Sequence, residues 1–119
     1  MKAKYGCPVR ATIDTLSGKW KVQAVWRLSF GPLRFAELRD LLGGVSEKVL
    51  TAQLRELEKD GVVNRTVVHS SPPKVTYSLS ASGQTLIPLL EGLCEWGSKQ
   101  FGITPNLPRN PQVVNATNS

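Results

Sequence analysis

One segment of this chain, residues 47–60, carries basic and small side chains at a spacing suited to DNA contact. At about 100° per residue of an α-helix, Lys48, Ala52 and Arg55 share one face, with Thr51 beside them. Arginine and lysine pair with guanine edges, and alanine or threonine touches the methyl group of thymine. These residues predict a helix that contacts bases in a major groove; the alternative is an ordinary solvated helix face.

A second set of polar residues predicts contacts with the DNA backbone. His69, Ser70 and Lys74 surround a proline-containing stretch, and Arg65 precedes them. Contacts to sugar and phosphate position a protein without reading base sequence. For Arg65, an ion pair within the fold is an equal alternative. Ser46 stands where the N-cap of residues 47–60 is expected, and a capped helix N-terminus also holds phosphate.

The two cysteines differ in the chemistry that their surroundings predict. Cys7 precedes a predicted helix and lies three residues from both Lys4 and Arg10. A helix start and nearby cations favour the thiolate, which is the form that reacts with oxidants and electrophiles. We therefore expect any redox response at Cys7, the alternative being a packed residue near a dimer contact. Cys94 lies among leucines and is expected in the core or an interface.

The sequence does not indicate a metal site or a catalytic site. Two cysteines and one histidine do not supply the ligand spacing of a metal site. The sequence also lacks a grouped nucleophile, base and acid, and it has no glycine loop of the phosphate-binding type. We therefore expect no enzyme activity, no metal and no cofactor.

Two short helices around a glycine turn would position the base-reading residues. Residues 34–42 place apolar side chains at helical spacing, and Gly43-Gly44-Val45 ends that helix. Residues 47–60 then place three leucines opposite the cations, namely Leu50, Leu54 and Leu57. Two helices joined by a short turn that contains glycine are typical of a helix-turn-helix, whose second helix enters the major groove.

The segment after the second helix predicts a wing. Residues 62–69 are rich in β-branched side chains and indicate a strand, and residues 74–79 alternate between apolar and polar. Pro72 and Pro73 cannot continue either strand, because proline lacks the N–H donor. The predicted fold class is therefore mainly α with a small two-stranded β-wing (α+β), a winged helix-turn-helix with terminal dimerisation helices.

Three further helices are predicted around this unit, at about residues 8–16, 19–29 and 80–101. Trp20 and Trp26 lie on a helix that is apolar nearly all round and are expected in the core, whereas Lys19 and Lys21 could reach flanking phosphate. Pro88 is expected to bend the last helix. The first and last helices have more apolar surface than a small domain can cover. We expect a homodimer interface formed by Val9, Ile13, Leu89, Leu93 and Trp96.

An ordered set of short motifs runs along the chain, namely Cys7-Pro8-Val9, Gly18-Lys19-Trp20, Arg34-Phe35, Glu37-Leu38, Ser46, Lys48, Leu50-Thr51, Leu54, Leu57, Asp60-Gly61, Arg65, Tyr77-Ser78-Leu79, Gly83 and Cys94-Glu95-Trp96. This set resembles the HxlR-type winged-helix regulators of bacteria, distantly similar to the MarR group. The resemblance covers roughly residues 7–101 and implies a homodimeric DNA-binding regulator. Some similar regulators use the cysteine of their Cys-Pro motif for sensing.

Length and charge predict one domain with short extensions. The expected parts are an N-terminal arm at 1–6, the winged domain at 7–102 and a disordered tail at 103–119, which is rich in proline and asparagine. The net charge of +6 suits an anionic partner, and residues 1–27 hold six cations against one anion. No signal peptide or membrane span is visible, so a cytoplasmic protein is expected.

These observations together predict a sequence-specific DNA-binding transcriptional regulator that acts as a homodimer on a palindromic double-stranded operator. A small-molecule or electrophile effector is compatible with Cys7. The alternative is a winged helix that mediates protein–protein contact without specific DNA binding. An RNA-binding module is less favoured, because the sequence lacks an aromatic platform for unpaired bases.

Overall fold

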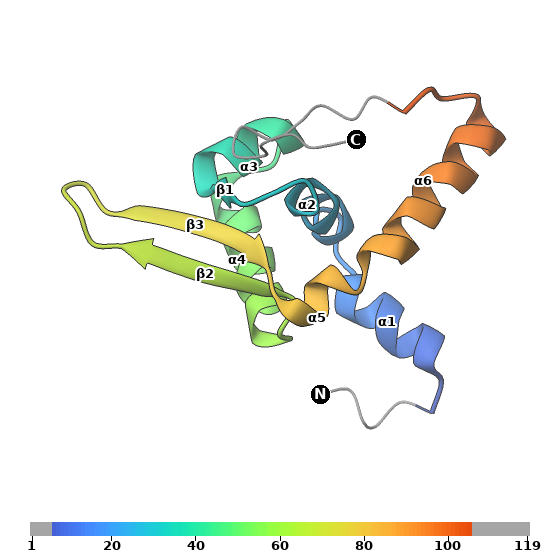
Figure 1. Cartoon of the computed structure of the whole chain (residues 1–119), viewed down its shortest axis with the longest axis horizontal. Helices are drawn as coiled ribbons and strands as arrows, with labels where there is room; N and C mark the ends of the chain where they lie inside the picture. Colours follow the sequence, from blue (N-terminus) through green and yellow to red (C-terminus); the bar gives the residue numbers. More distant parts are fainter. Residues whose placement is uncertain (1–5, 106–119) are drawn as a thin grey trace.

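The computed structural model describes residues 6–105, in which helices pack at the base of a small sheet, a hairpin projects at one end and two helices project at the other (Figure 1). The predicted fold class, a mainly α winged helix-turn-helix, is confirmed. Residues 1–5 of the predicted arm and 106–119 of the predicted tail lie outside the described part. In chain order, the elements are α1 (Pro8–Leu16), α2 (Lys21–Leu28), β1 (Leu33–Arg34), α3 (Phe35–Leu42), α4 (Glu47–Lys59), β2 (Val63–Val68), β3 (Lys74–Leu79), α5 (Ala81–Gln84) and α6 (Ile87–Phe101).

The apolar faces of these elements meet in one core. Each helix of the helix-turn-helix contributes its leucine stripe, and the sheet contributes the side chains that alternate inward along β3. Trp20 and Trp26 are half-buried against this core, as predicted. The most deeply buried large side chains are Val25, Leu33, Leu38, Leu50, Leu54, Leu57 and Val63.

The sheet has three strands, so the prediction of a two-stranded ribbon was incomplete. Strand β1 pairs antiparallel with β3, placing Leu33 opposite Tyr77, and β2 pairs with the other edge of β3. A strand of two residues is too short to show a periodicity of its own. Its conformation depends on backbone pairing with a segment more than forty residues further along the chain.

The prediction of one bent helix over residues 80–101 was wrong. The chain forms α5, a short connection, and then α6, and Pro88 lies in the first turn of α6. Proline is tolerated there because the first N–H groups of a helix have no partner within the helix. Ser80 caps α5 by accepting a hydrogen bond from the Gly83 N–H, and its hydroxyl donates to the carbonyl of Val62 at 3.0 Å. These bonds tie α5 to the base of the wing.

The arrangement separates two surfaces of the molecule. Figure 1 shows the tip of the wing at one end, while α1 and α6 lie at the opposite end and diverge from the helical body. Helix α4 runs along the sheet at the wing side. The predicted DNA-contacting elements and the predicted dimer elements are therefore carried on different parts of the fold.

Candidate nucleic-acid interface

Local hydrogen bonds fix the turn between α3 and α4. Gly43 and Gly44 have φ angles of 63° and 98°, which side chains with a Cβ adopt with strain. The Arg39 Nε donates to the carbonyl of Val45 at 3.1 Å, across the turn. Ser46 Oγ accepts from the Val49 N–H at 3.1 Å, so the predicted N-cap is confirmed. The turn thereby sets the direction in which α4 leaves α3.

Helix α4 divides sharply into a buried face and an exposed face. Leu50, Leu54 and Leu57 are fully buried. On the opposite side, Lys48, Ala52 and Arg55 are exposed, with Lys59 beyond them, and Thr51 is half-buried. The acidic side chains of α4, at Glu47, Glu56 and Glu58, fall on its two flanks. The exposed face therefore offers cations and small groups along its centre, although the helix as a whole is nearly neutral.

The predicted wing residues are all exposed. Arg65 lies on β2 opposite Tyr77 of β3, and Lys74 begins β3. His69 and Ser70 lie in the loop between the strands, where the Ser70 hydroxyl donates to the carbonyl of Pro72 at 2.6 Å. The wing thus carries polar groups along its length and at its tip. Whether each one contacts phosphate stays a prediction.

Lys21 lies in a different place from the one predicted. It is the first residue of α2, only 5% of its surface is exposed, and its Nζ pairs with Glu56 Oε1 of α4 at 2.5 Å. A buried ammonium group cannot also reach flanking phosphate, so that prediction was wrong. Lys19 remains exposed, with its Nζ 5.0 Å from the centre of the Trp20 ring. Helix α2 begins at Lys21, whereas the sequence predicted a start at about Lys19.

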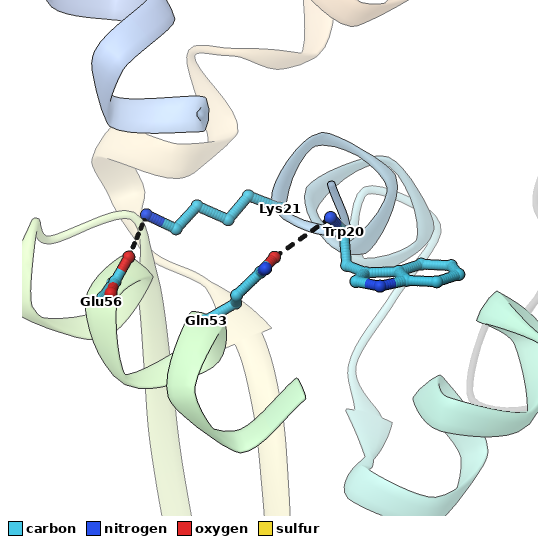
Figure 2. A network of polar contacts seen from close by, with 4 residues as sticks. All are labelled: Trp20, Lys21, Gln53 and Glu56. Carbon is cyan, nitrogen blue, oxygen red and sulfur yellow. Dashed lines mark hydrogen bonds and ion pairs between the residues drawn. The ribbon is translucent and has the colours of Figure 1, made fainter. Parts of the chain in front are cut away.

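A polar contact that the sequence did not reveal lies beside this ion pair. The side-chain oxygen of Gln53 of α4 accepts a hydrogen bond from the backbone N–H of Trp20 at 3.1 Å, as Figure 2 shows. Both contacts join α4 to the start of α2 (Figure 2). The residues are more than thirty positions apart in sequence, so no local spacing indicates the pairing.

The predicted dimer residues lie on an exposed apolar surface. Ile13 is 61% exposed, Leu93 52% and Trp96 61%, while Val9 and Leu89 are exposed as well. Four of these side chains line a groove of about 500 Å³ between α1 and α6, namely Val9, Ile13, Leu89 and Leu93. Trp96 packs edge-on against Phe101 with ring centres 6.1 Å apart. Large apolar side chains rarely remain open to water in this number unless another surface covers them.

The two cysteines occupy different environments, as predicted. Cys7 is exposed and stands at the N-cap position of α1, where its side chain makes no capping hydrogen bond. Cys94 is half-buried on α6 and lines a pocket with Trp26 and Phe30. Reagents in solvent therefore reach Cys7 more readily than Cys94.

Within residues 6–105, no cluster of histidine, cysteine, aspartate or glutamate has the arrangement of a metal site. None of the helices described there is long and apolar enough to cross a membrane. The surface features that remain to be explained are the cationic face of α4, the wing, and the apolar groove between α1 and α6.

The sequence and the fold are both similar to those of known transcriptional regulators. A family model described as HxlR-like helix-turn-helix matches residues 15–104. The HTH-type transcriptional regulator YybR of Bacillus subtilis (strain 168) is 47% identical over 110 residues, which cover 92% of this chain and 88% of YybR. YtcD of the same organism is 46% identical over 100 residues, covering 84% of this chain and 79% of YtcD. The solved structure of the redox regulator HypR in its oxidized form shares 45% identity with a TM-score of 0.74, covering 78% of this chain and 96% of that one.

Proposed function

Since this chain belongs to the HxlR-like helix-turn-helix family and is a DNA-binding transcriptional regulator, we propose that it binds a palindromic operator as a homodimer. Each protomer inserts α4 into a major groove, and its wing reaches the adjoining backbone. Two recognition helices related by a twofold axis require half-sites about one helical turn apart, or a multiple of it. The protein works in the cytoplasm, where its DNA target lies.

The observation that carries this proposal is the division of α4 into two faces. Its leucines anchor the helix in the core, while Lys48, Ala52 and Arg55 point away from that core. Thr51 lies at the edge of the exposed face. In this arrangement Arg55 and Lys48 pair with guanine edges, and Ala52 and Thr51 touch thymine methyl groups. Ser46 and the first turn of α4 hold a phosphate.

The wing supplies contacts that are independent of base identity. Arg65, His69, Ser70 and Lys74 are exposed along one projecting hairpin, which follows α4 directly in the chain. Their hydroxyl, imidazole and cationic groups bind sugar and phosphate and fix the orientation of the protomer on the duplex.

The groove between α1 and α6 supports a dimer. Val9 and Ile13 of α1 lie across it from Leu89 and Leu93 of α6, and Trp96 extends the same apolar surface. A second copy that covers this surface would remove it from water and would set the distance between the two α4 helices. That distance is the property on which recognition of paired half-sites depends.

Binding to a labelled palindromic duplex, selected from random sequence, tests the proposal. We expect two protomers per duplex, and log affinity that falls linearly with log salt because phosphate contacts release counterions. A duplex of the same composition in scrambled order is the control and should bind more weakly. A flat salt response or binding of one protomer per duplex would contradict the proposal, and would favour a winged helix used for protein contact.

A second function is supported by the exposure of Cys7. The solved relative HypR is named a redox regulator. In this chain Cys7 is solvent-exposed at the start of α1, next to the dimer residue Val9. Its thiolate would add to the carbon of an activated alkene, whose carbanion then takes a proton from water, or would attack one sulfur of a small disulfide and release the other sulfur as a thiolate. The new group would lie beside the proposed dimer contact. Such an effector regulates binding only if it stabilises one arrangement of the protomers over another.

A further inference from the structure

Lys21 is a charged side chain that the fold buries where the start of α2 packs on α4. Its side chain is 6% exposed, whereas that of its partner Glu56 is 62% exposed. Burial of an ammonium group is costly unless an opposite charge and hydrogen bonds compensate. The lysine is therefore held in place by a carboxylate that itself remains at the surface of α4.

A second contact holds the same flank of α4 to the turn between α1 and α2. Gln53 precedes Glu56 by three residues, so the two side chains lie on neighbouring turns of one helix side. The amide oxygen of Gln53 accepts from the backbone N–H of Trp20, the N-cap residue of α2, whose own side chain makes no capping hydrogen bond. Gly18 makes room, because a Cβ at that position would lie 3.2 Å from Gln53 Oε1. Figure 2 shows both contacts reaching from α4 to two consecutive residues, the N-cap residue Trp20 and Lys21, the first residue of α2.

The position of Glu56 gives the ion pair a consequence for DNA binding. On the helix, Glu56 neighbours Ala52 and Lys59, which belong to the exposed face of α4. A carboxylate at the edge of a surface that approaches phosphates repels them, unless a nearby cation compensates its charge. The Lys21 Nζ, at 2.5 Å from the carboxylate oxygen, supplies that compensation from the interior of the protein.

We propose that Lys21 is a positioning residue for DNA binding, which holds Glu56 to the start of α2 and cancels its charge on the flank of the recognition helix. Lys21 itself does not touch DNA. The inference rests on the proposed insertion of α4 into the major groove. It adds that the orientation and charge of this helix depend on the first residue of α2.

Lys21→Met tests the proposal, since methionine fills much of the same space without charge. We expect about tenfold weaker binding to the selected duplex at about 50 mM salt, and a smaller deficit at about 200 mM, because salt screens the exposed carboxylate. The Lys21→Met/Glu56→Gln double variant removes both charges and should recover most of the affinity. Lys99→Met breaks the exposed pair with Glu95 on α6, at 3.2 Å, and is the matched control that should bind as the wild type does.

A merely structural role for Lys21 gives a different pattern. Loss of Lys21 would then weaken DNA binding equally at both salt concentrations, and adding Glu56→Gln would not restore affinity; either result overturns the proposal.

If circular dichroism shows that Lys21→Met is unfolded, Glu56→Asp tests the proposal in its place. This variant keeps the buried lysine but withdraws the carboxylate from it by one methylene. Glu56→Asp should then show the salt-dependent loss, and wild-type affinity would overturn the proposal. Wild-type protein that fails to bind any duplex refutes the proposed function itself, which distinguishes the two failures.

Discussion

Gly83 lies so close to the backbone of Val62 that a Cβ at position 83 would be 2.2 Å from the Val62 carbonyl oxygen. The same carbonyl accepts hydrogen bonds from the N–H and the hydroxyl of Ser80. The close approach therefore packs α5 against the start of β2, at the point where the wing joins the helical body. Backbone atoms cannot move aside as a flexible side chain can, so only glycine fits there.

Gly83→Ala should lower the free energy of unfolding by about 1–3 kcal/mol, because the added methyl group displaces backbone. Thermal or urea unfolding followed by circular dichroism measures this change. Gly92→Ala on α6 is the matched control, since a Cβ there meets nothing within 4 Å. It should be neutral or stabilising by up to about 1 kcal/mol, as expected for glycine replaced within a helix. Equal stability of the two variants would contradict the packing described for Gly83.

Substitutions of Ser46 should separate stability from DNA binding. Ser46→Ala removes the acceptor for the Val49 N–H and should cost about 1 kcal/mol of folding stability. Ser46→Asp keeps an acceptor at the N-cap and should retain stability, but its negative charge would face the phosphate proposed to bind there. We expect weaker DNA binding by Ser46→Asp in a fluorescence anisotropy titration, with an unchanged melting temperature. Wild-type affinity in this variant would exclude a phosphate at the N-terminus of α4.

Arg55 and Lys74 should contribute to DNA binding in different ways. Arg55→Ala should cost about 1–3 kcal/mol of binding and relax the preference at particular base pairs, because a guanidinium reads guanine edges. Lys74→Ala on the wing should weaken binding to all sequences about equally, since phosphate is common to all of them. Selection of binding sites from random DNA by both variants tests this division. An unchanged base preference in Arg55→Ala would show that Arg55 does not read a base.

Leu93→Glu should disrupt the proposed dimer. The Leu93 side chain is exposed in the single chain, so the isolated fold tolerates a charge at this position. In an apolar dimer interface the same charge would be buried with no opposite charge to compensate it. Sedimentation velocity should show a folded monomer. Ala81→Glu places the same charge at an exposed position of α5 and should remain dimeric. A fully dimeric Leu93→Glu protein would show that the dimer interface does not include this part of α6.

Cys7 should react with electrophiles before Cys94 does. Cys7 is exposed at the start of α1, whereas Cys94 is half-buried beside Trp26. The rate of alkylation at each thiol, followed by mass spectrometry together with DNA binding, measures the difference. Cys7→Ser should bind DNA and lose the response to the electrophile, and Cys94→Ser is the matched control that should keep it. Faster modification of Cys94, or a response that persists in Cys7→Ser, would refute sensing through Cys7.

Much of this fold is determined by information that is local in the sequence. The three leucines of α4 repeat with the period of a helix, Ser46 supplies a cap, and Gly43 and Gly44 permit the turn. Residues 74–79 alternate with the period of a strand. Helical and extended periodicities reflect backbone geometry, so they can be predicted without knowledge of the tertiary structure. The exposed cationic face of α4 follows directly, because leucines on one side leave the other side to solvent.

The remaining features depend on residues that only the fold brings together. Strand β1 exists because Leu33 pairs with Tyr77, and Pro88 lies in the first turn of α6 because α5 ends before it. Lys21 has the sequence character of a surface cation, yet packing of α2 on α4 buries it against Glu56. The residues around Lys21 in the sequence do not indicate that Glu56 is its partner. Local propensity selected the elements of this protein, whereas long-range packing decided which polar side chains reach solvent and which hold the recognition helix in place.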